Sequence, residues 1–277
     1  MSPFTLQAAD RIAPADLHAA FAAAFADYLL GPFGLPFEQW AYFLLRQGVE
    51  LKHSRVALTQ DGIVALALVA PHGKRWRLAS MGAIPSARGS GAAPALLADM
   101  AARARADGRS ALALETFAQN PRAVRLYQKH GFVIRHTLHG YTRAPGASEA
   151  SAVPAAPVER ERALAWLKDA EAGIGELALQ VCAPVIQALA TDWQAWQRGS
   201  AQLVFSVNGG TVTLHSLIDG TPNQHDAQAL LRQLAAALPA QAWDVPQLQR
   251  ADLGGEALLA AGCERKALYQ YWMECPL

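Results

Sequence analysis

A glycine-rich turn between a strand and a helix is the feature that most restricts how this chain can fold. Residues 76–84 have strand character, and residues 92–106 carry apolar side chains at helical spacing. The first amides of a helix lack partners within the helix, and the helix dipole is positive there, so such a turn presents N–H groups to an anion. Gly89 and Gly91 allow a close approach. The sequence therefore predicts a phosphate-holding loop at residues 88–94, although glycines before a helix also occur in plain turns.

The spacing of these glycines excludes two better-known nucleotide loops. Gly91 is followed by Ala92-Ala93-Pro94, so the pattern Gly-x-Gly-x-x-Gly does not hold, and no Gly-Lys-Ser/Thr is present for a nucleoside triphosphate. A second motif lies further along the chain. There the strand Leu112-Ala113-Leu114-Glu115 is followed, at fixed spacing, by Asn120, Ala123, Leu126, Tyr127, Gly131 and Phe132.

Together, the two motifs resemble those of the GNAT superfamily of acyl-CoA-dependent N-acyltransferases. The pyrophosphate loop of that family has the form Gln/Arg-x-x-Gly-x-Gly/Ala, and Arg88, Gly91 and Ala93 occupy its defined positions. The family also carries Asn-x-x-Ala-x-x-Leu-Tyr-x-x-x-Gly-Phe after the next strand, as this chain does. The resemblance covers about residues 4–143. It implies an α/β (α+β mixed-sheet) architecture, the acyl-CoA N-acyltransferase fold.

The elements expected from hydrophobic periodicity follow the same order as in that family. Apolar residues recur every four positions between Leu17 and Leu29, which predicts an early helix. The expected elements are strand 4–11, helices 15–30 and 37–47, strands 55–59, 63–69 and 76–84, helix 92–106, strand 111–117, helix 122–130 and strand 132–142.

Length and composition predict a second unit. The chain has 277 residues, more than the ~100–200 usual for one domain. We expect a catalytic domain at 1–145, an Ala-, Pro-, Ser- and Gly-rich linker at 146–158, and a degenerate GNAT-like domain at 159–277. The last of these is expected to contain strands 203–207 and 211–218, a helix 223–238 and a strand after Gly262.

The second half is interpreted as a degenerate repeat of the first. Gly262-Cys263 matches Gly131-Phe132, which places Leu258 where the first half has Tyr127. Where the first half has glycines before its helix, the second half has Thr221-Pro222-Asn223-Gln224-His225-Asp226, so we expect no acyl-CoA binding there. The second half is expected to shape the acceptor pocket or to form a homodimer contact, and the sequence does not choose between them.

The resemblance implies acetyl-CoA as the acyl-donating cosubstrate. In the family, backbone amides of the strand before the loop bond the pantetheine arm and the thioester carbonyl. The corresponding residues here are Met81, Gly82, Ala83 and Ile84, and Gly82 favours a local bulge. The implied binding set also contains Arg88, Gly89, Ser90, Gly91, Ala92, Ala93, Asn120, Ala123 and Tyr127. Asn120 precedes a helix, so it caps that helix, contacts the pantetheine, or does both.

Acyl transfer from a thioester to an amine requires a base for the amine and an acid for the departing thiolate. The family motif places Tyr127 at the sulfur as the general acid; the alternative is that its ring only packs the helix. Glu115, at the end of a strand, is the candidate base, or else a partner of Arg88 or Arg109. Lesser candidates are His53, His136 and His139. No metal role is supported, because no ligand pair stands at suitable spacing with a third partner.

The acceptor is expected near the first two helices. An aromatic wall there favours an apolar or aromatic amine over a polycation, although most of its rings are expected in the core. Its members are Tyr28, Phe33, Phe37, Trp40, Tyr42 and Phe43.

Charge and cysteine content exclude several other classes. A net charge of +1 argues against nucleic-acid binding, and the three cysteines form no Cys-x-x-Cys pair, which favours a reduced cytoplasm. No stretch is long and apolar enough for an export signal or a membrane span. The sequence thus predicts an acetyl-CoA-dependent N-acetyltransferase acting on a primary amine of a small molecule or peptide. A non-catalytic acyl-CoA-binding or sensing protein, and a structural module that binds no CoA, are the alternatives.

Overall fold

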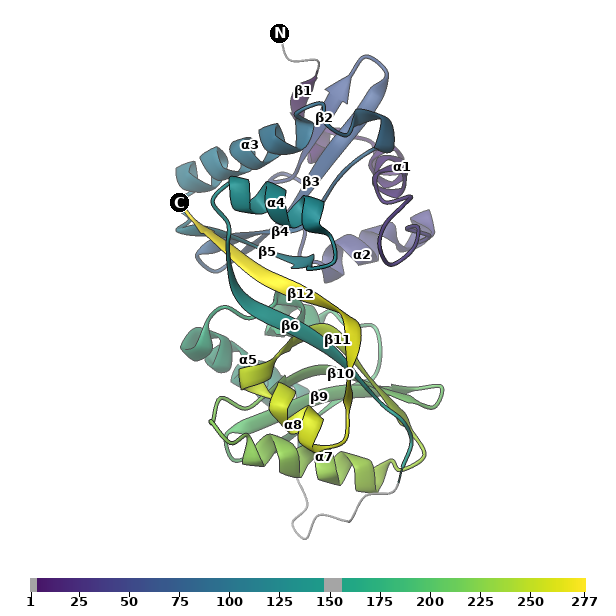
Figure 1. Ribbon diagram of the computed structural model, residues 1–277, viewed down its shortest axis with the longest axis vertical. Helices are drawn as coiled ribbons and strands as arrows, with labels where there is room; N and C mark the ends of the chain where they lie inside the picture. The colour runs from purple at the N-terminus through teal and green to yellow at the C-terminus, as the bar shows by residue number, and fades with distance from the viewer. Residues whose placement is uncertain (1–3, 147–155) are drawn as a thin grey trace. The chain divides into compact units, whose positions relative to one another are not determined.

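The computed structural model describes residues 4–146 and 156–277, and these form two compact units (Figure 1). The first unit contains 4–116, Asn120–Arg135 and Met273–Leu277. The second contains Phe117–Gln119 and the described part of His136–Trp272. Most of the expected linker, 147–155, lies outside the described residues, and Ala156–Val158 form a strand instead because they pair with another strand. The domain limits expected from the sequence stay a prediction, since compact units reflect packing rather than ancestry.

The first unit is a mixed sheet with helices. Its strands follow the order β1-β2-β3-β4-β5, in which only the β4–β5 pair is parallel. The elements are β1 (Thr5–Ala8), α1 (Pro14–Ala24), α2 (Trp40–Arg46), β2 (Arg55–Thr59), β3 (Gly62–His72), β4 (Arg75–Ala83), α3 (Ala92–Ala106), β5 (Ala111–Phe117) and α4 (Pro121–Lys129). This confirms the expected fold class and element order.

Helix α1 is shorter than expected. It ends at Ala24 rather than at residue 30, because the carbonyl of Phe25 accepts hydrogen bonds from the amides of Tyr28 (3.3 Å) and Phe33 (3.3 Å) and so closes a turn. The first strand is likewise short, and residues 9–11 form a 3-10 turn. Both differences lie at element ends, where local hydrogen bonds compete with the regular pattern.

The aromatic residues of α1 and α2 pack with each other in the core of the first unit. Phe21 lies 4.6 Å from Phe33 and 5.1 Å from Trp40 between ring centroids, and Trp40 stacks on Phe43 at 5.4 Å. Trp40 is only 2% exposed, whereas Phe37 is 45% exposed. Of the six rings expected to form an aromatic wall, Trp40 is buried and Phe33 and Phe43 pack against this core, so half of them, not most, belong to it.

The second unit repeats much of this architecture. Its strands follow the order β12-β6-β11-β10-β9-β8-β7. The elements are β6 (Val133–Arg143), β7 (Ala156–Val158), α5 (Arg160–Ile174), α6 (Ala183–Gln187), β8 (Trp193–Arg198), β9 (Ala201–Asn208), β10 (Thr211–Ile218), α7 (His225–Ala237), β11 (Ala242–Arg250), α8 (Gly255–Ala260) and β12 (Glu264–Pro276). The first residues of β6 and the last of β12 belong to the first unit.

A shared irregularity supports the interpretation of the second half as a repeat. Ala79 is an extra residue in β4, because Leu78 and Ser80 pair with neighbouring residues of β3. His215 is an extra residue in β10 in the same way, 136 residues further on. In both units the part of the strand before the extra residue pairs in parallel with the strand that follows the next helix.

The end of each repeat is also the same. The amide of Phe132 bonds the carbonyl of Tyr127 at 3.1 Å, and 131 residues further on the amide of Cys263 bonds that of Leu258 at 3.0 Å. Gly131 and Gly262 have φ values of 85° and 80°, so each allows the chain to leave its helix in a left-handed turn. The predicted match of Gly131-Phe132 with Gly262-Cys263 is therefore confirmed.

Candidate functional site

The first unit opens where β4 and β5 separate. The two strands pair from Arg75–Ala111 to Leu78–Leu114, but β4 continues to Ala83 and β5 to Phe117. Within the described chain, no strand pairs with the edge of β4 that faces this opening. Because unpaired backbone groups need other partners, this edge can bond an extended ligand.

The expected bulge lies at Ala79 and not at Gly82. Gly82 serves instead for close packing, since a Cβ there would lie 3.0 Å from the Cβ of Ala24 and 3.1 Å from Cε2 of Phe25. The missing side chain lets the end of α1 approach β4 beside the opening. Sequence reasoning thus identified a special backbone position but assigned it the wrong cause.

The loop from β4 to α3 has the backbone of an anion cradle. Gly89 and Gly91 have φ values of 88° and 87°, a region that glycine adopts without strain, and Gly91 stands directly before α3. Among the described residues, the amides of Gly89, Gly91 and Ala93 donate no hydrogen bond. No atom lies within 4 Å of where a Cβ of either glycine would stand. These donors and this space fit a diphosphate; the binding itself stays a prediction.

Arg88, the first residue of the loop motif, is held by Asp27. Its two terminal nitrogens donate to the two carboxylate oxygens, each at 2.5 Å, and its Nε lies 3.4 Å from the carbonyl of Ala83. The hydrogen bond from Arg88 lowers the pKa of Asp27, and Arg122 adds to this effect at longer range. No spacing in the sequence points to Asp27, because it lies 61 residues from its partner.

Tyr127 and Asn120 lie on and before α4. The ring of Tyr127 is buried and meets Phe132 edge-on, with centroids 5.7 Å apart. Burial, and next the nearby Tyr28, raise the pKa of the Tyr127 hydroxyl, so this phenol is protonated at neutral pH. Asn120 caps α4, since its side-chain oxygen accepts from the amide of Ala123 at 3.1 Å, as the capping interpretation predicted.

Glu115 forms a buried ion pair with Arg77. Nε and Nη2 of Arg77 both lie 2.6 Å from Oε2 of Glu115, and the two side chains are only 6% and 3% exposed. The other carboxylate oxygen, Oε1, is buried and has no hydrogen-bond partner among the described residues. The partners expected from the sequence, Arg88 and Arg109, are wrong. Arg77 stands on the strand adjacent to Glu115, whereas Arg88 bonds Asp27 and Arg109 bonds Asp107.

The histidine candidates lie in different environments. His53 stacks on Trp76 at 4.6 Å between ring centroids, and burial lowers its pKa. His136, in the second unit, lies 2.6 Å from the carboxylate of Glu176. Burial also lowers the pKa of His139, which belongs to that unit. In the described first unit, Glu115 is thus the candidate base beside the opening between β4 and β5.

The corresponding opening of the second unit is closed. Gln249 on β11 donates its side-chain amide to the carbonyl of Leu217 on β10 at 3.1 Å, which bridges the two separated strands. Leu177 and Val181 line the small cavity that remains there. A Cβ at Gly254 would lie 2.9 Å from Cγ of Leu217, so the packing is tight.

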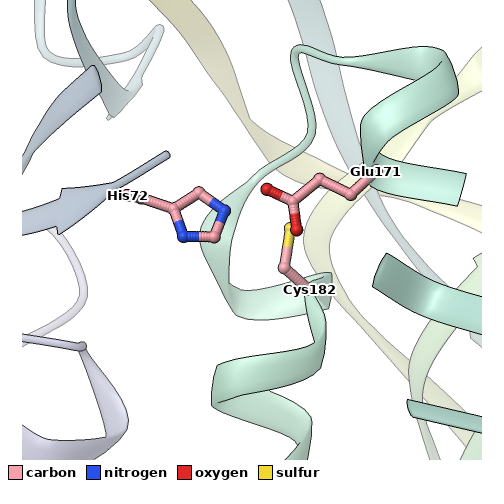
Figure 2. Close-up of side chains that lie close together, drawn as sticks. All are labelled: His72, Glu171 and Cys182. Atoms are coloured by element: carbon pink, nitrogen blue, oxygen red, sulfur yellow. The ribbon is translucent and has the colours of Figure 1, made fainter. Parts of the chain in front are cut away.

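Neither unit, taken by itself, brings three metal-ligating side chains together among the described residues. In the second unit Glu171 of α5 and Cys182, just before α6, lie side by side, as Figure 2 shows. The Cys182 thiol is buried and donates to the carbonyl of Ala178 at 3.3 Å. The third residue labelled in that figure, His72, belongs to the first unit. No helix of the described chain is long and apolar enough to cross a bilayer.

Comparison with known proteins gives the same fold. Residues 19–132 match the sequence model of the Acetyltransferase (GNAT) family. A GCN5-related N-acetyltransferase from Sphaerobacter thermophilus is 15% identical, with a TM-score of 0.68 over 100% of this chain and 96% of that one. One from Anabaena variabilis ATCC 29413 is 16% identical, with a TM-score of 0.67 over 98% and 72%. No curated protein matches the sequence. At these identities the structures show the shared fold, and the likeness includes the second half.

Proposed function

We propose, because residues 19–132 match the sequence model of the acetyltransferase (GNAT) family, that the chain is an N-acetyltransferase that uses acetyl-CoA. Its acceptor is a primary amine of a small molecule or peptide. One observation carries the proposal: the free edge of β4 leads directly into a glycine loop whose amides have no partner among the described residues. Within residues 4–146 and 156–277, both features occur together in the first unit alone, so the proposed reaction is assigned to that unit.

Backbone groups of the first unit supply the binding. The amides of Gly89, Gly91 and Ala93, together with the positive end of α3, would hold the diphosphate of acetyl-CoA. The edge of β4 from Met81 to Ile84 would bond the pantetheine arm and the thioester carbonyl. Fixed amides aimed at that carbonyl stabilise the oxyanion that develops during attack, without reorganisation at the moment of reaction.

Tyr127 is proposed to act on the departing sulfur. A thiol has a pKa of about 8.5 and an unperturbed phenol about 10, and the pKa of Tyr127 is raised further by burial, so complete proton transfer to a thiolate is unfavourable. A hydrogen bond from the phenol to the developing thiolate is favourable, however, because charge-assisted hydrogen bonds are stronger than neutral ones. Tyr127 therefore stabilises the leaving group chiefly as a hydrogen-bond donor.

Glu115 is proposed to accept the proton of the amine. Arg77 fixes one carboxylate oxygen and leaves Oε1 as the atom that takes this proton, directly or through a water molecule. An unpartnered buried oxygen is costly, so a role in the reaction would explain why it is retained.

The acceptor is proposed to approach beside the segment that follows α1. That segment and α2 present exposed apolar side chains, which favour an amine with an apolar body. They are Leu29, Leu30, Phe37 and Leu45, which are 42%, 57%, 45% and 63% exposed. The absence of metal and nucleic acid from the reaction, and a cytoplasmic location, remain part of the proposal.

The test has two stages. Calorimetry with acetyl-CoA measures binding, and a screen of small amines, amino acids and peptides measures release of free thiol. Absence of binding would contradict the proposal altogether. Binding without thiol release from any amine would favour the second candidate, an acyl-CoA-sensing protein, which the ion pair of Glu115 with Arg77 supports because it restrains the proposed base.

A further inference from the structure

Asp219, the residue directly after β10, carries a fully buried carboxylate. Counted from the bulge, it lies 136 residues after Ala83, the last residue of β4. Its Oδ2 accepts from the amide of Ala227 at 3.1 Å, in the first turn of α7. Its Oδ1 accepts from the amide of Thr221 at 3.0 Å, the hydroxyl of Thr221 at 2.7 Å and the hydroxyl of Ser200 at 3.1 Å.

These donors keep the carboxylate charged. Burial acts to raise the pKa of Asp219, but the hydrogen bonds from Thr221, Ala227 and Ser200 outweigh it, so the pKa lies below its usual value. A negative charge inside the second unit is thus fully satisfied by the chain itself.

The length of the connection explains how an internal carboxylate comes to this place. Equivalent residues are 136 apart at the bulge but 133 apart at the first residues of α3 and α7, so the second half is three residues shorter between strand and helix. The shorter connection does not contain a counterpart of the two glycines Gly89 and Gly91. Asp219 instead meets the helix start directly.

A second buried side chain accepts a hydrogen bond from the start of the next helix, α8. Gln224, only 2% exposed, accepts from the amide of Ala257 in α8 at 2.9 Å and donates to the carbonyl of Ala251 at 2.8 Å. In the first unit the equivalent helix, α4, begins with the cap of Asn120. The first turns of α7 and α8 therefore both donate to side chains of the second unit itself, Asp219 and Gln224.

We infer that Asp219 is a built-in anion, which occupies in the second half the helix-start position that the glycine loop leaves open in the first. This carboxylate makes the second unit independent of any external anion. It also blocks phosphate from the start of α7. The inference rests on the contacts of the second unit and does not depend on the activity proposed for the first.

The experiment removes the carboxylate and supplies it from solution. Asp219→Ala should lower the Tm by about 5–10 °C, because four donors, among them the buried amide of Ala227, lose their common acceptor. Sodium formate, a free carboxylate small enough for the vacated space, should restore part of this loss in a saturable way. Sodium chloride at equal ionic strength should not.

Leu230→Ala is the matched control. Leu230 is buried in the same helix, so its truncation destabilises the same region without removing an anion. Formate that stabilises both variants equally would reflect a general salt effect and would overturn the inference. An unchanged Tm for Asp219→Ala would overturn it as well.

Asp219→Asn serves if the alanine variant does not fold. Its amide is nearly the same size but places N–H groups against donors, so it should lower the Tm and show no gain with formate. A Tm equal to that of the original chain would mean that the negative charge is not needed there, and the inference would fail.

Discussion

The two halves of this chain share a bulged strand that separates from its parallel neighbour, but they treat the opening in opposite ways. In the first half the edge of β4 beyond Leu78 is unpaired within the described chain, and the glycine loop presents free amides. In the second half Gln249 bridges the strands and Asp219 bonds the helix start. Backbone groups that a ligand would satisfy still need partners when the ligand is lost. The second half supplies those partners from its own side chains.

The groups suited to chemistry also differ between the halves. Leu258 stands at the position of Tyr127, and Pro246 stands 131 residues after Glu115. The second half therefore lacks both the phenol and the carboxylate, while it keeps the helix end and the strand that carry them in the first. Fold and chemistry are separable here, because the scaffold depends on apolar packing and backbone bonds rather than on these side chains.

The largest expected effect comes from giving the first half an internal carboxylate like that of the second. Gly91→Glu should abolish measurable acetyl-CoA binding, because the new side chain places a negative charge in the cradle and disturbs the left-handed turn. Calorimetry measures the affinity. Gly108→Glu is the control, since Gly108 also has positive φ and open space but lies at the other end of α3. Equal binding losses in both variants would contradict the role of the loop.

Tyr127→Phe tests the difference between Tyr127 and Leu258. The variant should lower kcat by about 100-fold, because the developing thiolate loses its hydrogen-bond donor, and should leave the affinity for acetyl-CoA nearly unchanged. Thiol release under saturating acetyl-CoA measures kcat. Tyr42→Phe in α2 is the control for removal of a phenol elsewhere in the unit. Unchanged turnover in Tyr127→Phe would leave only the packing role for this ring.

Glu115→Gln tests the proposed base. It should lower kcat by about 10- to 100-fold, because the amide keeps an acceptor for Arg77 but cannot take a proton from the amine. Glu274→Gln is a close match, since Glu274 is also buried and pairs with Arg75 at 2.6 Å. Similar rate losses in both variants would indicate that buried ion pairs matter only for the structure of the first unit.

The sequence predicts best those elements whose limits are set locally. β2, α3, β5 and β10 have the expected bounds, because breakers such as Asp61-Gly62 and Asp107-Gly108 stand directly beside clear apolar patterns. β11 has no counterpart among the expected elements, since Pro246 interrupts it and its pairing with β6 shifts at that point. Helix α5 is also missing from the expectations, although residues 160–174 do carry apolar residues at helical spacing.

Contacts between distant residues account for the rest. The glycine loop and Tyr127 follow from short motifs, whereas Asp27 beside Arg88, Arg77 beside Glu115 and Gln249 beside Leu217 depend on how strands and loops meet. The last residues of β12 belong to the first unit, which no pattern within a single segment could reveal. Motifs therefore located the candidate site, but they did not identify the groups that restrain it.

The smallest expected effect concerns the ion pair between Arg88, in the glycine loop, and Asp27. Asp27 is 57% exposed at its side chain, and it competes with a diphosphate for Arg88. Asp27→Asn should therefore tighten acetyl-CoA binding by about two- to five-fold at low salt, and this gain should shrink as salt screens the exposed charges. Calorimetry at two ionic strengths measures both quantities. Asp61→Asn, in the β2–β3 turn, removes an equal charge away from the loop and should change neither. Weaker binding in Asp27→Asn would mean that Asp27 positions Arg88 for the ligand rather than competing with it, so that the first half also depends on an internal carboxylate.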